Sequence, residues 1–285
     1  MNKVALVTDS TAYIPDELMK EYDIEIIPLQ VIWNGQVYRD NVDITPNEFY
    51  SRLQSAKTMP STSQATPGDF IELYKSLIAK GFDILSVHIS SKLSGTMDSA
   101  IQAKNALPDQ RIELVDSLSA SMAMGFPVLK AAKAAKEGAT LEDCKDIVLN
   151  SYKNTGILFA VKTLEFLHRG GRIGGAAAFL GNKLDMKPIL ELRDGKIEAI
   201  QRIRTMKKAV DKLVELTLQK FEGHKAIHLA CLHANAPEDA HNLLNKLTDK
   251  INSDNVIDAV CTEVSPVIGT HIGPGTIGVT YHLDD

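Results

Sequence analysis

The chain has 285 residues, of which 44% are hydrophobic and 24% charged, and its formal net charge is -5. This composition is typical of a soluble globular protein, and a length prior of ~150 residues per domain favours two domains. The negative charge argues against a general nucleic-acid-binding protein, which would carry a basic face. Asp9 interrupts the first apolar run, and no apolar run approaches the ~20 residues of a membrane helix, so we expect a cytoplasmic protein.

The first half of the chain alternates apolar strands, polar turns and helices, which predicts a parallel sheet with helices on both faces. The first strand ends in Asp9, Ser10 and Thr11, which could cap the next helix or line a pocket. Asn34 and Gly35 indicate a hairpin turn. The predicted strands are 3–8, 24–32, 36–38, 84–89 and 111–115, and the predicted helices are 16–22, 45–53, 69–80, 97–106, 121–135 and 140–150.

Residues 89–96 place several hydroxyl side chains between a predicted buried strand and a predicted helix. In an open α/β sheet this is the crevice where ligands bind, and the free N–H groups of the helix start favour an anion. Gly95 lets the backbone approach a ligand, and Ser94 and Thr96 can donate hydrogen bonds to a bound oxygen. The alternative is that these hydroxyls only cap the helix.

A second hydroxyl-rich segment, 59–67, is bounded by prolines and is predicted to be a loop. Thr62, Ser63 and Gln64 lie shortly before the helix that follows Pro67. The segment therefore offers another place for an anion, or it is only a solvated connection.

The second half of the chain is predicted to contain antiparallel strands, because Asp194 and Gly195 form a strong hairpin signal. Residues 168–175 contain four glycines and two arginines but match neither phosphate-binding glycine motif. We expect a tight structural turn there, with Arg172 facing a ligand or a partner. The predicted strands are 156–161, 187–192, 196–200, 225–232, 258–264 and 278–281, and the predicted helices are 164–167, 205–220 and 237–249.

His224, His228 and His233 suggest a metal site, but only the first two share a face of their strand and no carboxylate completes a ligand set. We therefore expect no metal. The three cysteines are far apart and predict neither a disulfide framework nor a zinc site. His271 differs from the other histidines because glycine and proline turns flank it, where side chain and backbone can converge on a cleft.

Several of these segments together resemble the DegV family of bacterial fatty-acid-binding proteins. One motif alone would carry little weight, but this many in the same order over nearly the whole chain are specific. The matching segments are 9–11, 60–64, 90–96, 116–117, 170–173, 187–188, 202–205 and 271–275.

The resemblance implies an α/β protein of two domains with a long-chain fatty acid between them. Residues 1–155 would form a domain with a mostly parallel sheet and flanking helices, and residues 156–285 a domain with a mixed sheet. It also implies the role of FakB, the lipid-binding and non-catalytic subunit of fatty-acid kinase. Its partner FakA, the ATP-binding subunit, would phosphorylate the bound carboxylate to an acyl-phosphate. No cofactor, no nucleic acid and at most transient membrane contact are expected.

By the family match, Thr62, Ser94 and Gly95 bind the fatty-acid carboxylate, with His271 close by. Neutral hydroxyls would hold a carboxylate softly and leave an oxygen nucleophilic, whereas an arginine would bind it bidentately and oppose its attack on a phosphoryl group. The chain carries no nucleotide-binding motif, which fits a subunit that presents a substrate rather than one that binds ATP.

The match also makes Arg172 and the segment of Arg202 and Arg204 candidates for the partner surface. With Lys207 and Lys208, the last two form a basic patch that is either a solvated face or a docking site for an acidic surface. Further candidates for pocket or partner contact are Ser63 and Ser121.

Two other functions stay open from the sequence. A stand-alone hydrolase or transferase would use Ser94 as nucleophile and His271 as base, although no G-x-S-x-G elbow and no orienting acid is evident. A lipid-sensing regulator would have the same sequence features as the carrier.

Overall fold

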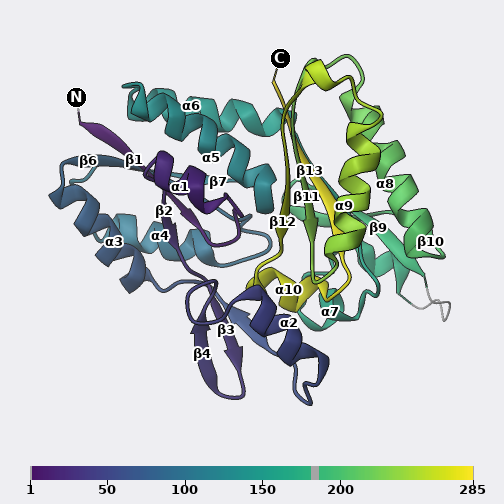
Figure 1. The fold of residues 1–285 in the computed structure, drawn as a ribbon. Coiled ribbons are helices and arrows are strands. Elements are labelled where there is room, and N and C mark those ends of the chain that lie inside the picture. The colour runs from purple at the N-terminus through teal and green to yellow at the C-terminus, as the bar shows by residue number, and fades with distance from the viewer. Residues whose placement is uncertain (1, 181–185, 285) are drawn as a thin grey trace.

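The computed structural model describes residues 2–180 and 186–284. Its first sheet has four parallel strands in the order β2-β1-β6-β7 (Figure 1). Helices α3 and α4 pack on one face of this sheet, and α5 and α6 pack on the other. The prediction of a parallel sheet with helices on both faces is confirmed. The elements are β1 (Lys3–Asp9), α1 (Asp16–Glu21), β2 (Glu25–Ile27), α3 (Pro67–Ala79), β6 (Phe82–His88), α4 (Thr96–Asn105), β7 (Ile112–Asp116), α5 (Ser121–Lys136) and α6 (Leu141–Ser151).

The second sheet has six strands in the order β10-β9-β8-β13-β11-β12, and its pairs are antiparallel except for β11 with β12. Helices α8 and α9 pack on one face of this sheet. In the described part of the chain, no helix is long and apolar enough to cross a membrane. The predicted mixed sheet is confirmed. The elements are β8 (Thr155–Ala160), β9 (Lys187–Arg193), β10 (Lys196–Ile203), α8 (Met206–Phe221), β11 (Ala226–His233), α9 (Pro237–Thr248), β12 (Val256–Glu263) and β13 (Ile277–Asp284).

A third, antiparallel sheet lies below the first two in Figure 1, beside α2 (Pro46–Gln54). The hairpin that Asn34 and Gly35 predicted is confirmed as two of its strands, whereas its third strand was not predicted. It consists of β3 (Gln30–Trp33), β4 (Gln36–Arg39) and β5 (Ser61–Ser63). The prediction of a single strand over 24–32 was wrong, because Pro28 has no N–H for a strand ladder and the chain changes sheets there. The prediction of a loop over 59–67 was wrong at 61–63, which pair with β3.

A short helix, α10 (Pro266–Ile272), carries His271 where the sequence predicted turns on both sides. Pro266 occupies its first turn, and Gly273 follows it with a φ of 76° that a side chain rarely adopts. Helix α10 packs against α7 (Glu165–Arg169) and α2 in the space between the sheets (Figure 1). The predicted glycine-rich turn over 168–175 runs from the last residues of α7 into the 3-10 segment η2 (Gly174–Phe179).

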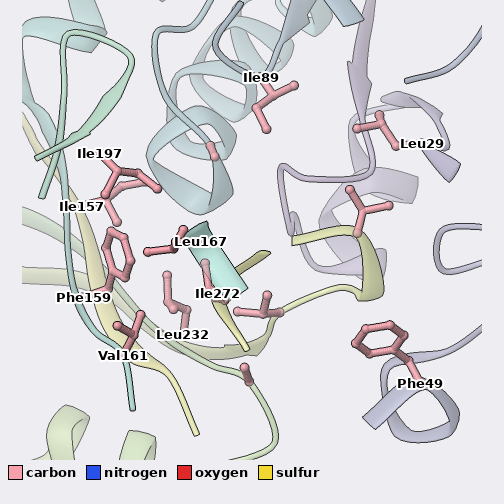
Figure 2. Close-up of a cluster of buried hydrophobic side chains, with 14 of the residues drawn as sticks. Leu29, Phe49, Ile89, Ile157, Phe159, Val161, Leu167, Ile197, Leu232 and Ile272 are labelled. Carbon is pink, nitrogen blue, oxygen red and sulfur yellow. The ribbon is translucent and has the colours of Figure 1, made fainter. Parts of the chain in front are cut away.

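Alternation along β8 shows how the second sheet divides its side chains between two faces. Leu158 and Ala160 pack toward α8, whereas Ile157 and Phe159 belong to the apolar cluster between the sheets. Figure 2 shows Ile157 and Phe159 on the same side of the seam, with Ile89 of the first half of the chain opposite. The sheets divide the chain near the start of β8, and the predicted domain boundary at 155/156 stays a prediction.

Asp9, at the carboxyl end of β1, organises the adjoining loop from inside the protein. Its carboxylate accepts hydrogen bonds from the Ile89 N–H at 2.9 Å and from the Thr11 hydroxyl at 2.6 Å, and it contacts His88 Nδ1 at 3.1 Å. Both Asp9 and His88 are fully buried. The suggestions that Asp9, Ser10 and Thr11 cap α1 or line the pocket are wrong: Pro15 is the N-cap of α1, and these side chains bond within the fold.

Replacing Asp9 with alanine should lower the free energy of unfolding by about 3 kcal/mol or more, because several buried donors lose their acceptor. Urea unfolding measures this change. Asp109→Ala is the control, since Asp109 is exposed and its loss should change stability by about 0.5 kcal/mol or less. Equal stability of the two variants would show that the Asp9 hydrogen bonds contribute nothing to the fold.

Candidate functional site

A pocket lies between the two larger sheets, inside the apolar cluster that joins them. It holds about 900 Å³ of space free of protein atoms, including the part open to solvent. Much of its wall is apolar, and Figure 2 shows several of the side chains that face it from both halves of the chain. Among them are Leu29, Ile89, Ile157, Phe159, Leu232 and Ile272.

Thr62 and His271 meet at the pocket although 209 residues separate them. Pairing of β5 with β3 sets Thr62 opposite Val31, and α10 supplies His271. The Thr62 hydroxyl lies 2.8 Å from His271 Nε2. The two residues that the family resemblance assigned to one site are therefore in direct contact.

Ser94 lines the same pocket just before α4, and Gly95 follows it at the start of that helix. The Ser94 hydroxyl bonds the Thr96 hydroxyl at 2.8 Å and accepts the Thr96 N–H at 3.3 Å, so it also orders the turn. Gly95 is the N-cap, and a Cβ there would lie 3.0 Å from the side-chain nitrogen of Gln64. The structure thus brings together the two hydroxyl-rich segments that the sequence presented separately.

Arg172 also lines the pocket, with its side chain fixed by backbone carbonyls. Its Nε donates to the Leu93 carbonyl at 3.0 Å and its Nη1 to the Gly170 carbonyl at 2.6 Å. Two nitrogens of the guanidinium are therefore engaged. The group places a positive charge at the pocket, but not all of its N–H groups are available to a carboxylate. Its role toward a ligand or a partner stays a prediction.

His271 is neutral near pH 7. Burial, and to a smaller extent the nearby positive charge of Arg172, together lower the pKa of its imidazole to about 4. A Cβ at Gly170 would lie 2.1 Å from His271 Nδ1, so only glycine lets the backbone pass there. Within residues 2–180 and 186–284, that Nδ1 is buried without a hydrogen-bond partner. The imidazole is thus a neutral group packed between Thr62 and the backbone at Gly170.

A buried carboxylate that sequence reasoning missed holds α10 in place. Asp40 accepts the Val267 N–H at 3.1 Å in the first turn of α10 and the Ser10 hydroxyl at 2.7 Å at the end of β1. Burial raises the pKa of Asp40 to about 6. Nothing in the local sequence signals this role, because both partners are distant along the chain.

The remaining predicted residues fall into two groups. Ser63 and Ser121 line the pocket, whereas Arg202 and Arg204 do not. Arg202 donates to the Ala178 carbonyl at 2.9 Å and lies 4.4 Å from the centre of the Phe179 ring, while Arg204 is exposed just beyond the end of β10. No group of three His, Cys, Asp or Glu residues in the described ranges could hold a metal ion.

Comparison with known proteins gives consistent results. A family model described as "Uncharacterised protein, DegV family" matches residues 3–284. A DegV domain-containing protein of Clostridium perfringens is 37% identical over 282 residues, which is 98% of each chain. The structure of a fatty-acid-binding DegV family protein from Thermus thermophilus superposes with a TM-score of 0.92 at 36% identity, over 99% of this chain and 100% of that one. The structure of DegV of Bacillus subtilis, described as a fatty-acid-binding protein, superposes with a TM-score of 0.90 at 34% identity, over 100% of both chains.

The neutral state of His271 can be tested by NMR titration of the purified protein with no ligand added. Its imidazole should titrate near pH 4, and Arg172→Gln should raise that pKa by removing a positive charge. Because the unfolded chain binds the proton more tightly, near the ordinary value of 6.5, this group should make stability fall as the pH drops from about 6.5 to about 4.

Arg169→Gln is the control for that titration, because Arg169 is exposed and paired with Glu165 on α7. It should leave the pKa of His271 unchanged. A wild-type His271 that titrates near 6.5 would contradict the buried, neutral site.

Proposed function

The chain belongs to the DegV family, and from this we propose that it binds a long-chain fatty acid in the pocket between its two larger sheets. One observation carries the proposal: an apolar pocket that also holds a cluster of neutral hydrogen-bond donors. A fatty acid has the matching chemistry, an apolar chain with one anionic end. The similar proteins of T. thermophilus and B. subtilis, both described as binding fatty acids, support the same ligand class.

Burial of the chain would supply most of the affinity. At ~0.8 kcal/mol per methylene, a C16 chain contributes on the order of 10 kcal/mol before ordering costs are subtracted. Association and ordering cost several kcal/mol, about 4–15 in different treatments. For costs in the lower part of this range the balance favours bound lipid, and the polar cluster would fix which end of it faces which way.

In this proposal the carboxylate lies against Thr62, Ser94 and Gly95, with His271 close by. The two hydroxyls donate to the carboxylate oxygens, and the start of α4 adds free N–H groups with a positive dipole. Arg172 supplies a favourable positive potential while its Nε and Nη1 stay bound to the backbone. A carboxylate held in this way keeps an oxygen lone pair available for reaction.

We propose further that the chain acts in the cytoplasm as a FakB-type subunit, with at most transient membrane contact. It would present the carboxylate to an ATP-bearing, FakA-like kinase subunit. A carboxylate oxygen would attack the γ-phosphorus of ATP, the bond to the ADP oxygen would break, and an acyl-phosphate and ADP would form. The absence of a nucleotide-binding motif in the sequence fits this division of labour.

The geometry gives little support to a stand-alone hydrolase. His271 bonds Thr62, and in the described residues the Ser94 hydroxyl bonds Thr96 instead of a histidine. With a pKa near 4, His271 would be a weak general base at neutral pH. A lipid-sensing regulator would use the same pocket, and the kinase-coupled assay below separates it from the carrier.

Ser94→Ala should weaken fatty-acid binding by about 1–3 kcal/mol, because a buried charged acceptor loses a donor. Mass spectrometry of organic extracts should first identify copurified fatty acid, and titration of that lipid into the delipidated protein then gives the affinity. Ser91→Ala, at an exposed neighbouring serine, should leave binding unchanged. Wild-type affinity in Ser94→Ala would remove Ser94 from the carboxylate site, and an extract without fatty acid, from a protein that also fails to bind added lipid, would contradict the carrier.

Arg202→Ala combined with Arg204→Ala should raise the concentration of this protein needed for half-maximal kinase rate, with lipid affinity unchanged. The physical reason is loss of long-range attraction to an acidic partner surface, so added salt should reduce the difference. Titrations of lipid and of kinase on the same variant measure both quantities.

Lys75→Ala with Lys80→Ala is the matched control, because both lysines are exposed on α3 or just beyond its end. It removes the same charge and should leave the kinase titration unchanged. Lost lipid binding with normal kinase docking in the arginine variant would contradict the docking role.

A further inference from the structure

Ser121 places a hydroxyl in the pocket wall that the carboxylate site does not use. It is the first residue of α5, it lines the pocket, and only 4% of the residue is exposed. Among the residues that the structure describes, its Oγ has no hydrogen-bond partner. A buried hydroxyl without a partner is costly, so a native structure normally satisfies it with a ligand or a water.

The surroundings of this hydroxyl are apolar. Ala120 before it and Ala123 after it both belong to the apolar cluster between the sheets, together with Ile157 and Phe159. Thr62 and Ser94 bond His271 and Thr96, and in the described residues the Ser121 hydroxyl shares no hydrogen bond with this polar cluster. Its apolar neighbours favour a place for Ser121 beside the acyl chain.

The start of α5 is also free to bind an oxygen atom. Its N-cap, Ala120, provides no side-chain hydrogen bond, and its first turn contains no acidic residue. The backbone at Ser121 is fixed in a left-handed conformation, φ 55°, by the bond from its N–H to the Thr11 carbonyl at 2.8 Å. The Cα–Cβ bond of Ser121 therefore has a defined direction, beside the N–H groups of the helix start.

We infer that the pocket takes a fatty acid whose chain carries a hydroxyl group, and that Ser121 is the residue that recognises it. This inference rests on the proposed fatty-acid function. The chain hydroxyl would accept a hydrogen bond from Ser121 or from the start of α5, which satisfies both the ligand and the protein. A purely hydrocarbon chain would leave the Ser121 hydroxyl unsatisfied or paired only with a water.

The test compares stearate with the positional isomers of monohydroxystearate on the delipidated full-length protein. At least one isomer should bind the wild type about tenfold more tightly than stearate, which corresponds to ~1.4 kcal/mol. In Ser121→Ala that preference should fall below about twofold, because hydroxystearate loses more affinity than stearate does. Alanine meets the same backbone strain as serine, and the exposed Ser91→Ala should keep the full preference.

Three outcomes would overturn the inference while fatty-acid binding itself stands. In the first outcome, the wild type prefers no isomer over stearate. In the second, the preference survives in Ser121→Ala. In the third, Ser121→Ala weakens the binding of stearate and hydroxystearate equally. The first would mean that a water satisfies Ser121, the second that another group reads the hydroxyl, and the third that Ser121 contacts the carboxylate. A protein that binds neither stearate nor any hydroxystearate would instead contradict the proposed function itself.

Discussion

Two sheets of this protein face each other across an apolar seam that their side chains do not fill. A void lined by apolar groups costs free energy, because the wall atoms lose their dispersion contacts. The fold retains this void between β8, β10 and β11 on one side and Leu29 and Ile89 on the other. A hydrocarbon chain would restore the missing contacts, so the same feature that weakens the empty protein favours the lipid-bound one.

The polar cluster of the seam depends on how α10 is anchored. Asp40 joins the first turn of α10 to Ser10 of the first half of the chain, and His271 lies near the other end of that helix. Since Thr62 comes from a strand of the third sheet, its contact with His271 forms only when all three sheets are assembled. The site is therefore a product of the complete fold, and no single segment contains it.

Local signals in the sequence predict most of the elements but few of the contacts. Continuous apolar runs marked the strands of the first sheet, and Thr66 with Asp69 and Thr140 with Asp143 form capping boxes where helices were expected. Strand β5 escaped prediction because Ser61–Ser63 has no apolar pattern and pairs with a strand some 30 residues away. Helix α10 is too short for a periodic signal, although Pro266 marks its start.

The residues of the site likewise divide into those that local sequence signals predict and those that depend on distant contacts. Hydroxyls near helix starts indicated possible anion sites at Ser94 and at Thr62, and the turns around His271 indicated a cleft, whereas the family resemblance assigned all three to one carboxylate site. The anchor Asp40 and the closely packed Gly170 could not be predicted, because their partners, Val267 and His271, come from distant parts of the chain.

The most direct test of the account is a crystal structure of the protein loaded with palmitate. The account predicts an acyl chain between the two larger sheets, with its carboxylate within hydrogen-bond distance of Thr62 Oγ1 and Ser94 Oγ. A chain bound outside this pocket, or one bound with its methyl end at Thr62 and Ser94, would contradict it.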